Sequence, residues 1–184
     1  MIDTYILDRF EDKLEKELTN LCIRYKMLPG CDVLPASDDI DEMWRRLAPE
    51  YMVDAVEQIR DYPTVSVAWA AYIGMAVAMG WDADWETMSK AEYRMFYGEQ
   101  GFDDMDEHIV RDILGLTLTG DEALQIEAMT RRCGETAVTL IRREQIDPQT
   151  PMAFHIFARA CKVMYRIGAA IQLTRLGYKM QPLN

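Results

Sequence analysis

Histidine is almost absent from this sequence of 184 residues, and that scarcity excludes several kinds of catalytic site. Neither of the two histidines, His108 and His155, belongs to an ExxH or HExxH pattern, so the ligand set of a ferritin-like di-iron site is missing. The sequence also contains no GxGxxG motif and no Walker loop, which are the usual phosphate-binding loops of nucleotide enzymes. No motif of this kind specifies a reaction.

Cysteine is scarce as well. The four cysteines, Cys22, Cys31, Cys133 and Cys161, form no CxxC pair and lie mostly on segments predicted to be helical. We therefore expect reduced, mainly buried thiols rather than a disulfide framework. The first residues are acidic and show neither the basic region nor the cleavage site of a signal peptide, so we expect a cytoplasmic protein.

Positive charge is also in short supply, since 20 Lys and Arg face 31 Asp and Glu for a net charge of -11. Such a field repels phosphates, and nucleic-acid binding is not expected. With 49% hydrophobic and 28% charged residues, the composition is that of a globular protein.

What the sequence has in quantity is helical periodicity. Apolar residues recur every three or four positions from Ile2 to Tyr25, which predicts a first helix over about residues 2–27. Ser37 is placed to cap a second helix, and Pro49 to start a third that turns Met52, Val56 and Ile59 inward. Further helices are expected over about 64–87, 120–145 and 151–176, with short ones starting near Ser89 and Asp103. The predicted fold is all-α, a single domain over residues 1–184 with seven or eight helices in one compact bundle.

One uncharged stretch, "VSVAWAAYIGMAVAMGW" from Val65 to Trp81, is near the lower length limit for a membrane-spanning helix. It holds five alanines and no leucine, and acids rather than basic clusters follow it, so a membrane span is not expected. A helix that is apolar on all sides is buried on all sides. We therefore expect this segment to be the central helix of the bundle.

Three glycines, Gly74, Gly134 and Gly168, lie inside the long predicted helices, where each costs about 1 kcal/mol relative to alanine. They favour close crossings between helices. The alternative is that they leave room for a ligand, which would make the protein a small-molecule sensor.

Two acidic pentads, "DDIDE" and "DDMDE", are the strongest candidates for a metal-binding or catalytic site. Carboxylates in such clusters are ligands that Mg²⁺ accepts together with substrate phosphates. The candidate metal-binding residues are Asp38, Asp39, Glu42, Asp103, Asp104 and Glu107. The alternative is that the acids stabilise helix starts through the helix macrodipole.

The pentads also carry two resemblances to known families. Their spacing resembles the paired aspartate-rich motifs of isoprenyl diphosphate synthases. "EDKLE" followed by "DDIDE" resembles the acidic helices of all-α nucleotide pyrophosphohydrolases. Both resemblances cover only these short segments, and both imply Mg²⁺ and a diphosphate substrate.

Three cationic residues, Arg159, Lys162 and Arg166, are spaced three and four apart and so share one face of the last predicted helix. They would bind an anionic ligand or an acidic partner, or else pair with the acids of the same chain. Trp81 and Trp85 share a face of the central helix and suit either an interface or the core.

Two functions remain open from the sequence. The first is a non-catalytic binding or assembly module that associates with itself or with another protein and needs no cofactor. The second is a Mg²⁺-dependent enzyme acting on a phosphate or diphosphate compound through the two pentads.

Overall fold

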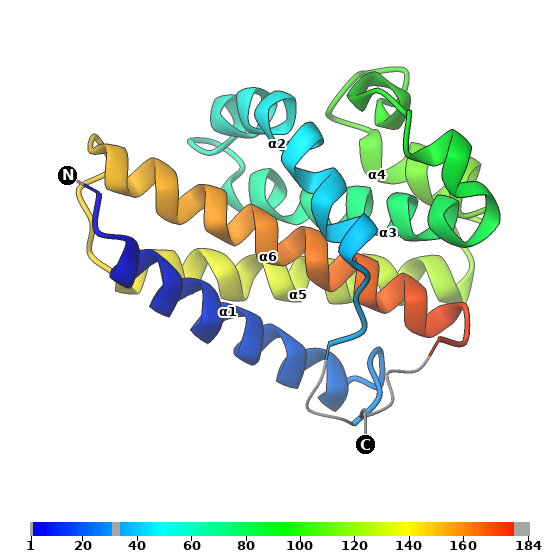
Figure 1. The fold of residues 1–184 in the computed structure, drawn as a ribbon, viewed down its shortest axis with the longest axis horizontal. Helices are drawn as coiled ribbons and strands as arrows, with labels where there is room; N and C mark the ends of the chain where they lie inside the picture. The colour runs from blue at the N-terminus through cyan, green and yellow to red at the C-terminus, as the bar shows by residue number, and fades with distance from the viewer. Residues whose placement is uncertain (1, 31–33, 179–184) are drawn as a thin grey trace.

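The described part of the chain consists of helices and the loops that join them. The computed structural model describes residues 2–30 and 34–178, in which there is no strand (Figure 1). Six α-helices follow one another: α1 (Thr4–Arg24), α2 (Asp38–Gln58), α3 (Pro63–Met88), α4 (Met105–His108), α5 (Asp121–Arg143) and α6 (Pro151–Arg175). A 3-10 helix, η1 (Tyr93–Phe96), and a π-helical turn, η2 (Ile109–Ile113), lie on either side of α4. The all-α bundle is confirmed, with six α-helices where seven or eight were expected.

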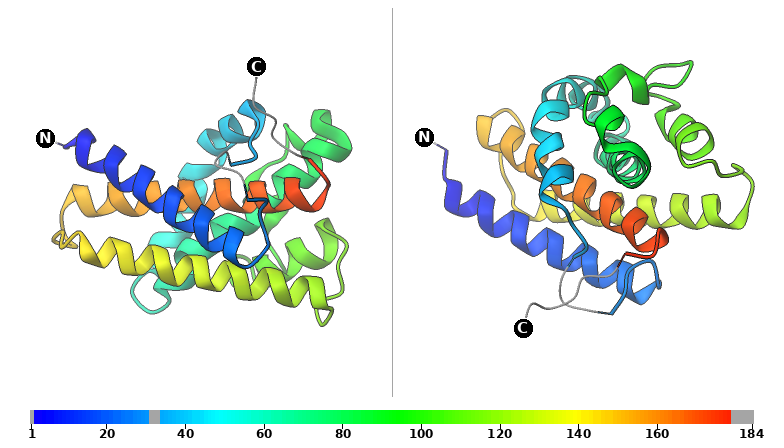
Figure 2. Two further views of the ribbon diagram at one scale, coloured as in Figure 1. Left: turned by 90° about the horizontal axis from the view of Figure 1, so that it is seen from below. Right: turned by 45° about the vertical axis from the view of Figure 1, so that its right-hand side comes forward.

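Helix α3 is the centre of the bundle. It contacts α2, α4, α5 and α6, and α6 in turn lies beside α1 (Figures 1 and 2). Of the described helices, α3 alone has the length and apolar composition that a membrane crossing needs, and 67% of its most apolar stretch is buried inside the bundle. Burial against four neighbouring elements accounts for a helix that is apolar on all sides.

The close crossing of α3 and α6 depends on two glycines that face each other's helix. A Cβ atom at Gly74 would overlap the carbonyl oxygen of Tyr165, and one at Gly168 would overlap that of Ala71. The two backbones are therefore in direct contact, and no space for a ligand remains between them. This contact removes the idea of a sensor pocket at these two glycines and confirms the close crossing.

Helix ends follow the local signals in the sequence. Asp3 caps α1 by accepting hydrogen bonds from the backbone N–H groups of Tyr5 and Ile6. Thr150 caps α6, and Gly177 takes a left-handed conformation (φ +93°) just after that helix ends. These interactions are short-range, since each joins residues only a few positions apart.

The prediction of a new helix at Pro49 is wrong, because α2 continues through this proline. Proline removes one backbone hydrogen bond, but buried side chains hold the helix to the core on both sides, Leu47 before it and Tyr51 after it. Val56 and Ile59 do not turn inward as expected: they are 44% and 39% exposed. Likewise, Ser89 closes α3 and does not open a new helix.

The described cysteines are free and buried, as expected. The Sγ atoms of Cys22 and Cys133 lie 3.7 Å apart between α1 and α5, and burial raises the pKa of Cys161. Cys31 lies outside the described residues. His155 is half-buried and its ring lies against that of Phe154.

Candidate functional site

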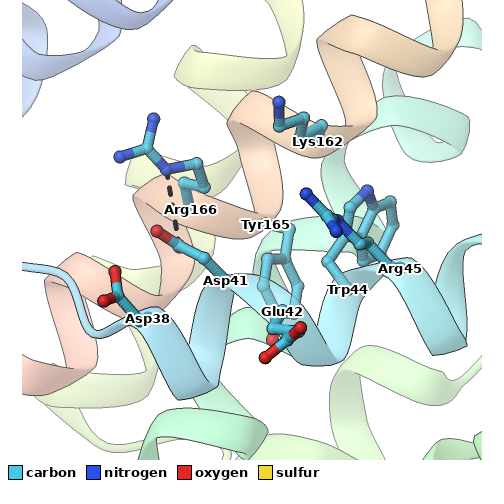
Figure 3. Close-up of a pocket in the computed structure, with 8 residues that line it drawn as sticks. All are labelled: Asp38, Asp41, Glu42, Trp44, Arg45, Lys162, Tyr165 and Arg166. Atoms are coloured by element: carbon cyan, nitrogen blue, oxygen red, sulfur yellow. Dashed lines mark ion pairs between the residues drawn. The ribbon is translucent and has the colours of Figure 1, made fainter.

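The first acidic pentad and the basic face of α6 line the same cleft. The start of α2 lies across α6, and the cleft between them has a volume of about 520 Å³ (Figure 3). We call it the charged cleft. It is lined by Asp38, Asp41, Glu42, Trp44, Arg45, Lys162, Tyr165 and Arg166.

The aromatic floor of the charged cleft holds α2 against α6. The rings of Trp44 and Tyr165 lie 4.8 Å apart, and the buried Tyr165 hydroxyl donates a hydrogen bond of 2.6 Å to the carbonyl oxygen of Ile40. Burial raises the pKa of this phenol, so it stays protonated as a donor. The sequence pattern did not single out these aromatic residues, because their partners come from distant parts of the chain.

The three cations of α6 are paired with acids of the same chain. Arg159 bonds to Asp8 at 2.7 Å, Lys162 lies 3.1 Å from Glu11, and Arg166 pairs with Glu15 of α1. The side chains of Arg159 and Arg166 are only 26% and 25% exposed. The basic face therefore joins α6 to α1. Of the two alternatives, binding of an anionic partner or pairing with acids of the same chain, the structure supports the pairing.

Asp41 links the first pentad to this network. Its carboxylate lies 3.5 Å from the Nε atom of Arg166, and Figure 3 shows the two side chains pointing toward each other. Desolvation raises the pKa of Asp41, while the Arg166 charge opposes that rise. Asp38, Asp39 and Asp41 also occupy the first turn of α2, where the helix macrodipole favours acids.

The second pentad lies elsewhere. Asp104 precedes α4 and accepts a hydrogen bond from the backbone N–H of Gln100 at 3.0 Å, while Asp103 and Glu107 are exposed to solvent. Asp106 faces a different pocket, between α3 and α5. The two pentads therefore do not line one cavity.

A preassembled metal centre is not formed by these carboxylates. Across the described residues, which include both pentads, no three His, Cys, Asp or Glu side chains are grouped so that they could hold one ion. The six candidate ligands are split between two parts of the bundle and serve helix starts and turns. The diphosphate chemistry implied by the two family resemblances lacks the geometry that it needs.

A second, apolar cavity lies at the end of the bundle where α5 connects to α6. This apolar groove has a volume of about 670 Å³. The end of α2 contributes Val56, Ile59 and Arg60, the end of α5 contributes Ile141 and Arg142, and α6 contributes Pro151, Ala153, Phe154, Ile156 and Phe157; Ile146, Pro148, Gln149 and Thr150 of the connection complete the lining. Sequence reasoning missed this groove because it assigned Val56 and Ile59 to the core.

Exposed apolar side chains gather around the apolar groove. Phe154, Val56 and Ile59 line it and are 46%, 44% and 39% exposed. Val53 of α2 and Tyr62, just before α3, do not line the groove but are close to these residues in the sequence, and they are 64% and 61% exposed. By contrast, Trp81 and Trp85 are half-buried and pack against the core, so the indole pair on α3 forms no open surface.

No protein-family model, curated protein or solved structure matches this chain.

The ionic connection between α1 and α6 has a measurable consequence. Replacing Arg166 by methionine keeps most of the side-chain volume but leaves Glu15 and Asp41 without their partner. We expect the free energy of unfolding to fall by roughly 1 to 2 kcal/mol, because these carboxylates are partly buried. The matched control is Lys90→Met, whose pair with Glu86 is fully exposed and whose loss should cost about 0.5 kcal/mol or less in urea titrations. Equal losses for the two variants would contradict a structural role for Arg166.

Proposed function

We propose that this protein is a non-catalytic binding module that associates with a second copy of itself through the apolar groove. The observation that supports this proposal best is the concentration of exposed apolar side chains at one end of the bundle. Val56, Ile59 and Phe154 line the same groove and are all at least 39% exposed. Contiguous apolar surface of this kind is a common mark of a protein-protein interface.

The charges around the apolar groove favour a second copy as the occupant. The groove is lined by two guanidinium groups, Arg60 and Arg142, and by no acid. The exposed acids Glu57 and Asp61 stand beside Arg60 at the end of α2. A two-fold interface brings the same surface of both subunits together, so it requires both signs of charge around one apolar centre. This end of the bundle meets that requirement, and the acids of one copy can meet the arginines of the other.

The proposal predicts a dimer that a single charge disrupts. Phe154→Glu places a carboxylate in the middle of the interface, where it meets its own symmetry mate across an apolar surface. We expect the dimer dissociation constant to rise by at least about 30-fold, the effect of losing a central aromatic contact. Sedimentation equilibrium over a range of protein concentrations measures this constant directly.

The matched control is Leu124→Glu, which introduces the same charge at an apolar residue that is 49% exposed near the start of α5, the end of that helix away from the groove. It should leave the dimer unchanged, and circular dichroism should show that both variants stay folded. A dissociation constant above about 100 μM is weak for a protein assembly. If the wild-type protein sediments as a monomer up to that concentration, the proposed self-association is wrong. The groove would then be a site for a different protein.

The second function left open by the sequence, a Mg²⁺-dependent enzyme, gains no support from a specific observation. It needs both pentads at one cavity, and they line separate ones. We retain the cytoplasmic location as part of the proposal, which the free, buried thiols of the described cysteines support.

A further inference from the structure

A small pocket between α3, α4 and α5 combines acids with aromatic rings. Its volume is about 250 Å³. We call it the aromatic-acidic pocket. It is lined by Thr64, Val65, Ala68, Trp69 and Tyr72 of α3, Asp106 of α4, and Glu127, Thr130, Arg131 and Glu135 of α5. The helical repeat explains the set, since Thr64, Ala68 and Tyr72, like Glu127, Arg131 and Glu135, follow one another every four residues.

The aromatic wall of this pocket is held in a fixed orientation. The rings of Trp69 and Tyr72 meet almost at right angles, with an interplanar angle of 87° and centroids 5.5 Å apart. The Trp69 indole N–H donates a hydrogen bond of 2.8 Å to the carbonyl oxygen of Phe102, which fixes the indole plane. In this edge-to-face pair both rings line the pocket, and the face of an aromatic ring attracts a cation through the ring quadrupole.

The charge of the pocket also favours a cation. Three carboxylates, Asp106, Glu127 and Glu135, face the single guanidinium of Arg131. Arg131 reaches Glu127 at 3.6 Å and is itself 59% exposed, so it lies at the rim and leaves the other two carboxylates without an ion pair among the described residues. Glu127 and Glu135 are exposed like Arg131, whereas Asp106 is half-buried. The pocket therefore carries more negative than positive charge, and Asp106 is its least exposed acid, next to the aromatic wall.

A buried hydroxyl that lines the pocket has no hydrogen-bond partner in the protein, which independently favours a polar ligand here. Thr130 is 2% exposed, and its Oγ1 atom has no partner in the structure. The Thr130 hydroxyl lies near the hydroxyl of Tyr72, but outside hydrogen-bond geometry. Burial raises the pKa of the Tyr72 phenol, and the nearby Thr130 opposes this rise. Buried polar groups are rarely left without partners in native proteins.

We propose that the aromatic-acidic pocket binds a small alkylammonium ion, with the ammonium group between Asp106 and the ring faces of Trp69 and Tyr72. A bare metal ion does not suit the site, because no three described carboxylates are grouped to hold one. The volume corresponds to about eight water molecules and sets a similar limit on the number of non-hydrogen atoms in the ligand. This site is separate from the apolar groove and does not depend on self-association.

The ionisation of Asp106 couples this binding to pH. Desolvation raises the pKa of this carboxyl to about 6. The groups that face it are Glu107 on its own helix, Glu127 and Arg131 from α5, and Tyr72 from α3. An ammonium ion stabilises the carboxylate, so binding should tighten as the pH rises through about 6 and weaken as the pH falls below it.

The first test is calorimetric titration with n-butylammonium chloride at pH 7.5, with n-butanol as the neutral analogue of the same size. We expect the ammonium ion to bind and the alcohol to bind at least tenfold more weakly. Asp106→Asn should weaken ammonium binding at least tenfold and remove the step near pH 6, and Thr130→Val should weaken it about threefold. The control Asp103→Asn, an exposed acid outside the pocket, should change nothing.

The Asp106→Asn variant is expected to stay folded under the conditions of this test. The folded protein holds Asp106 with a raised pKa, so its charge lowers stability once the pH exceeds the unfolded value near 4, and the loss is complete above about 6. Asp106→Asn should therefore be at least as stable as the wild type at pH 7.5. Equal binding of butanol and butylammonium, or unchanged binding by Asp106→Asn, would overturn the proposal.

A further titration distinguishes two possible ligands, a free amine and a lysine side chain of another protein. Nα-acetyl-lysine methylamide carries the same ammonium group on a peptide backbone. Because the pocket is small, we expect butylammonium to bind at least as tightly as this lysine analogue. Tighter binding of the lysine analogue would overturn the assignment to a free amine.

Discussion

Replacing Gly168 by alanine should lower the free energy of unfolding by about 3 kcal/mol or more. A methyl group there overlaps the carbonyl oxygen of Ala71, which belongs to the backbone of α3 and cannot rotate away. The two central helices would have to separate, and every side chain between them would lose contacts. For a chain of this length the unfolding midpoint should fall by roughly 6 to 12 °C, which differential scanning calorimetry can measure.

Gly134→Ala is the matched control for that result. A methyl group at Gly134 would lie 3.0 Å from Cγ2 of Thr64, 3.1 Å from Cβ of Ala68 and 3.2 Å from the carbonyl oxygen of Thr64. These contacts are tight but do not overlap as those at Gly168 do, so a shift of a few tenths of an ångström between α3 and α5 relieves them. Alanine also gains about 1 kcal/mol over glycine inside a helix. We expect a net change of about 1 kcal/mol or less in either direction. If the two variants lost the same stability, direct backbone contact between α3 and α6 would be contradicted.

The second large effect is expected at Phe10, which attaches α1 to the bundle. Its ring is 1% exposed and belongs to the row Leu7, Phe10, Leu14 and Leu18, which faces the core. Phe10→Ala should lower the free energy of unfolding by about 3 to 5 kcal/mol, since the site loses the buried ring and is left with a cavity. Chemical denaturation in urea measures this change at constant pH.

Tyr5→Ala provides the control on the same helix. Tyr5 is 73% exposed, so removal of its ring should change the free energy of unfolding by about 0.5 kcal/mol or less. A loss at Phe10 as small as that at Tyr5 would mean that α1 does not pack against α5 and α6. The measured difference therefore reports on the docking of α1 itself.

The charged cleft shows how far sequence reasoning reached toward a site. The spacing of Arg159, Lys162 and Arg166 correctly placed them on one helix face. Their partners, Glu11 and Glu15, come from a helix about 150 residues earlier in the chain. Spacing within a helix says nothing about which distant helix lies opposite, so the choice between a ligand site and an internal network had to wait for the structure.

The apolar groove shows the opposite error. Val56 and Ile59 continue the apolar pattern of α2, and a core position was the reasonable prediction. The neighbouring ends of α5 and α6 do not close over this part of α2 but leave a groove, in which these side chains are 44% and 39% exposed. A helical pattern records which face is apolar and does not record whether another element covers it.

The sequence by itself determined the all-α class, the buried central helix and most helix ends, because each depends on interactions between residues a few positions apart. It also pointed to the glycines where helices approach closely. The tertiary structure alone decided that the two pentads lie apart, that the basic face is neutralised by α1, and that Asp106 meets Trp69 and Tyr72 in one pocket. These juxtapositions join segments far apart in the chain, and packing of the whole bundle selects them.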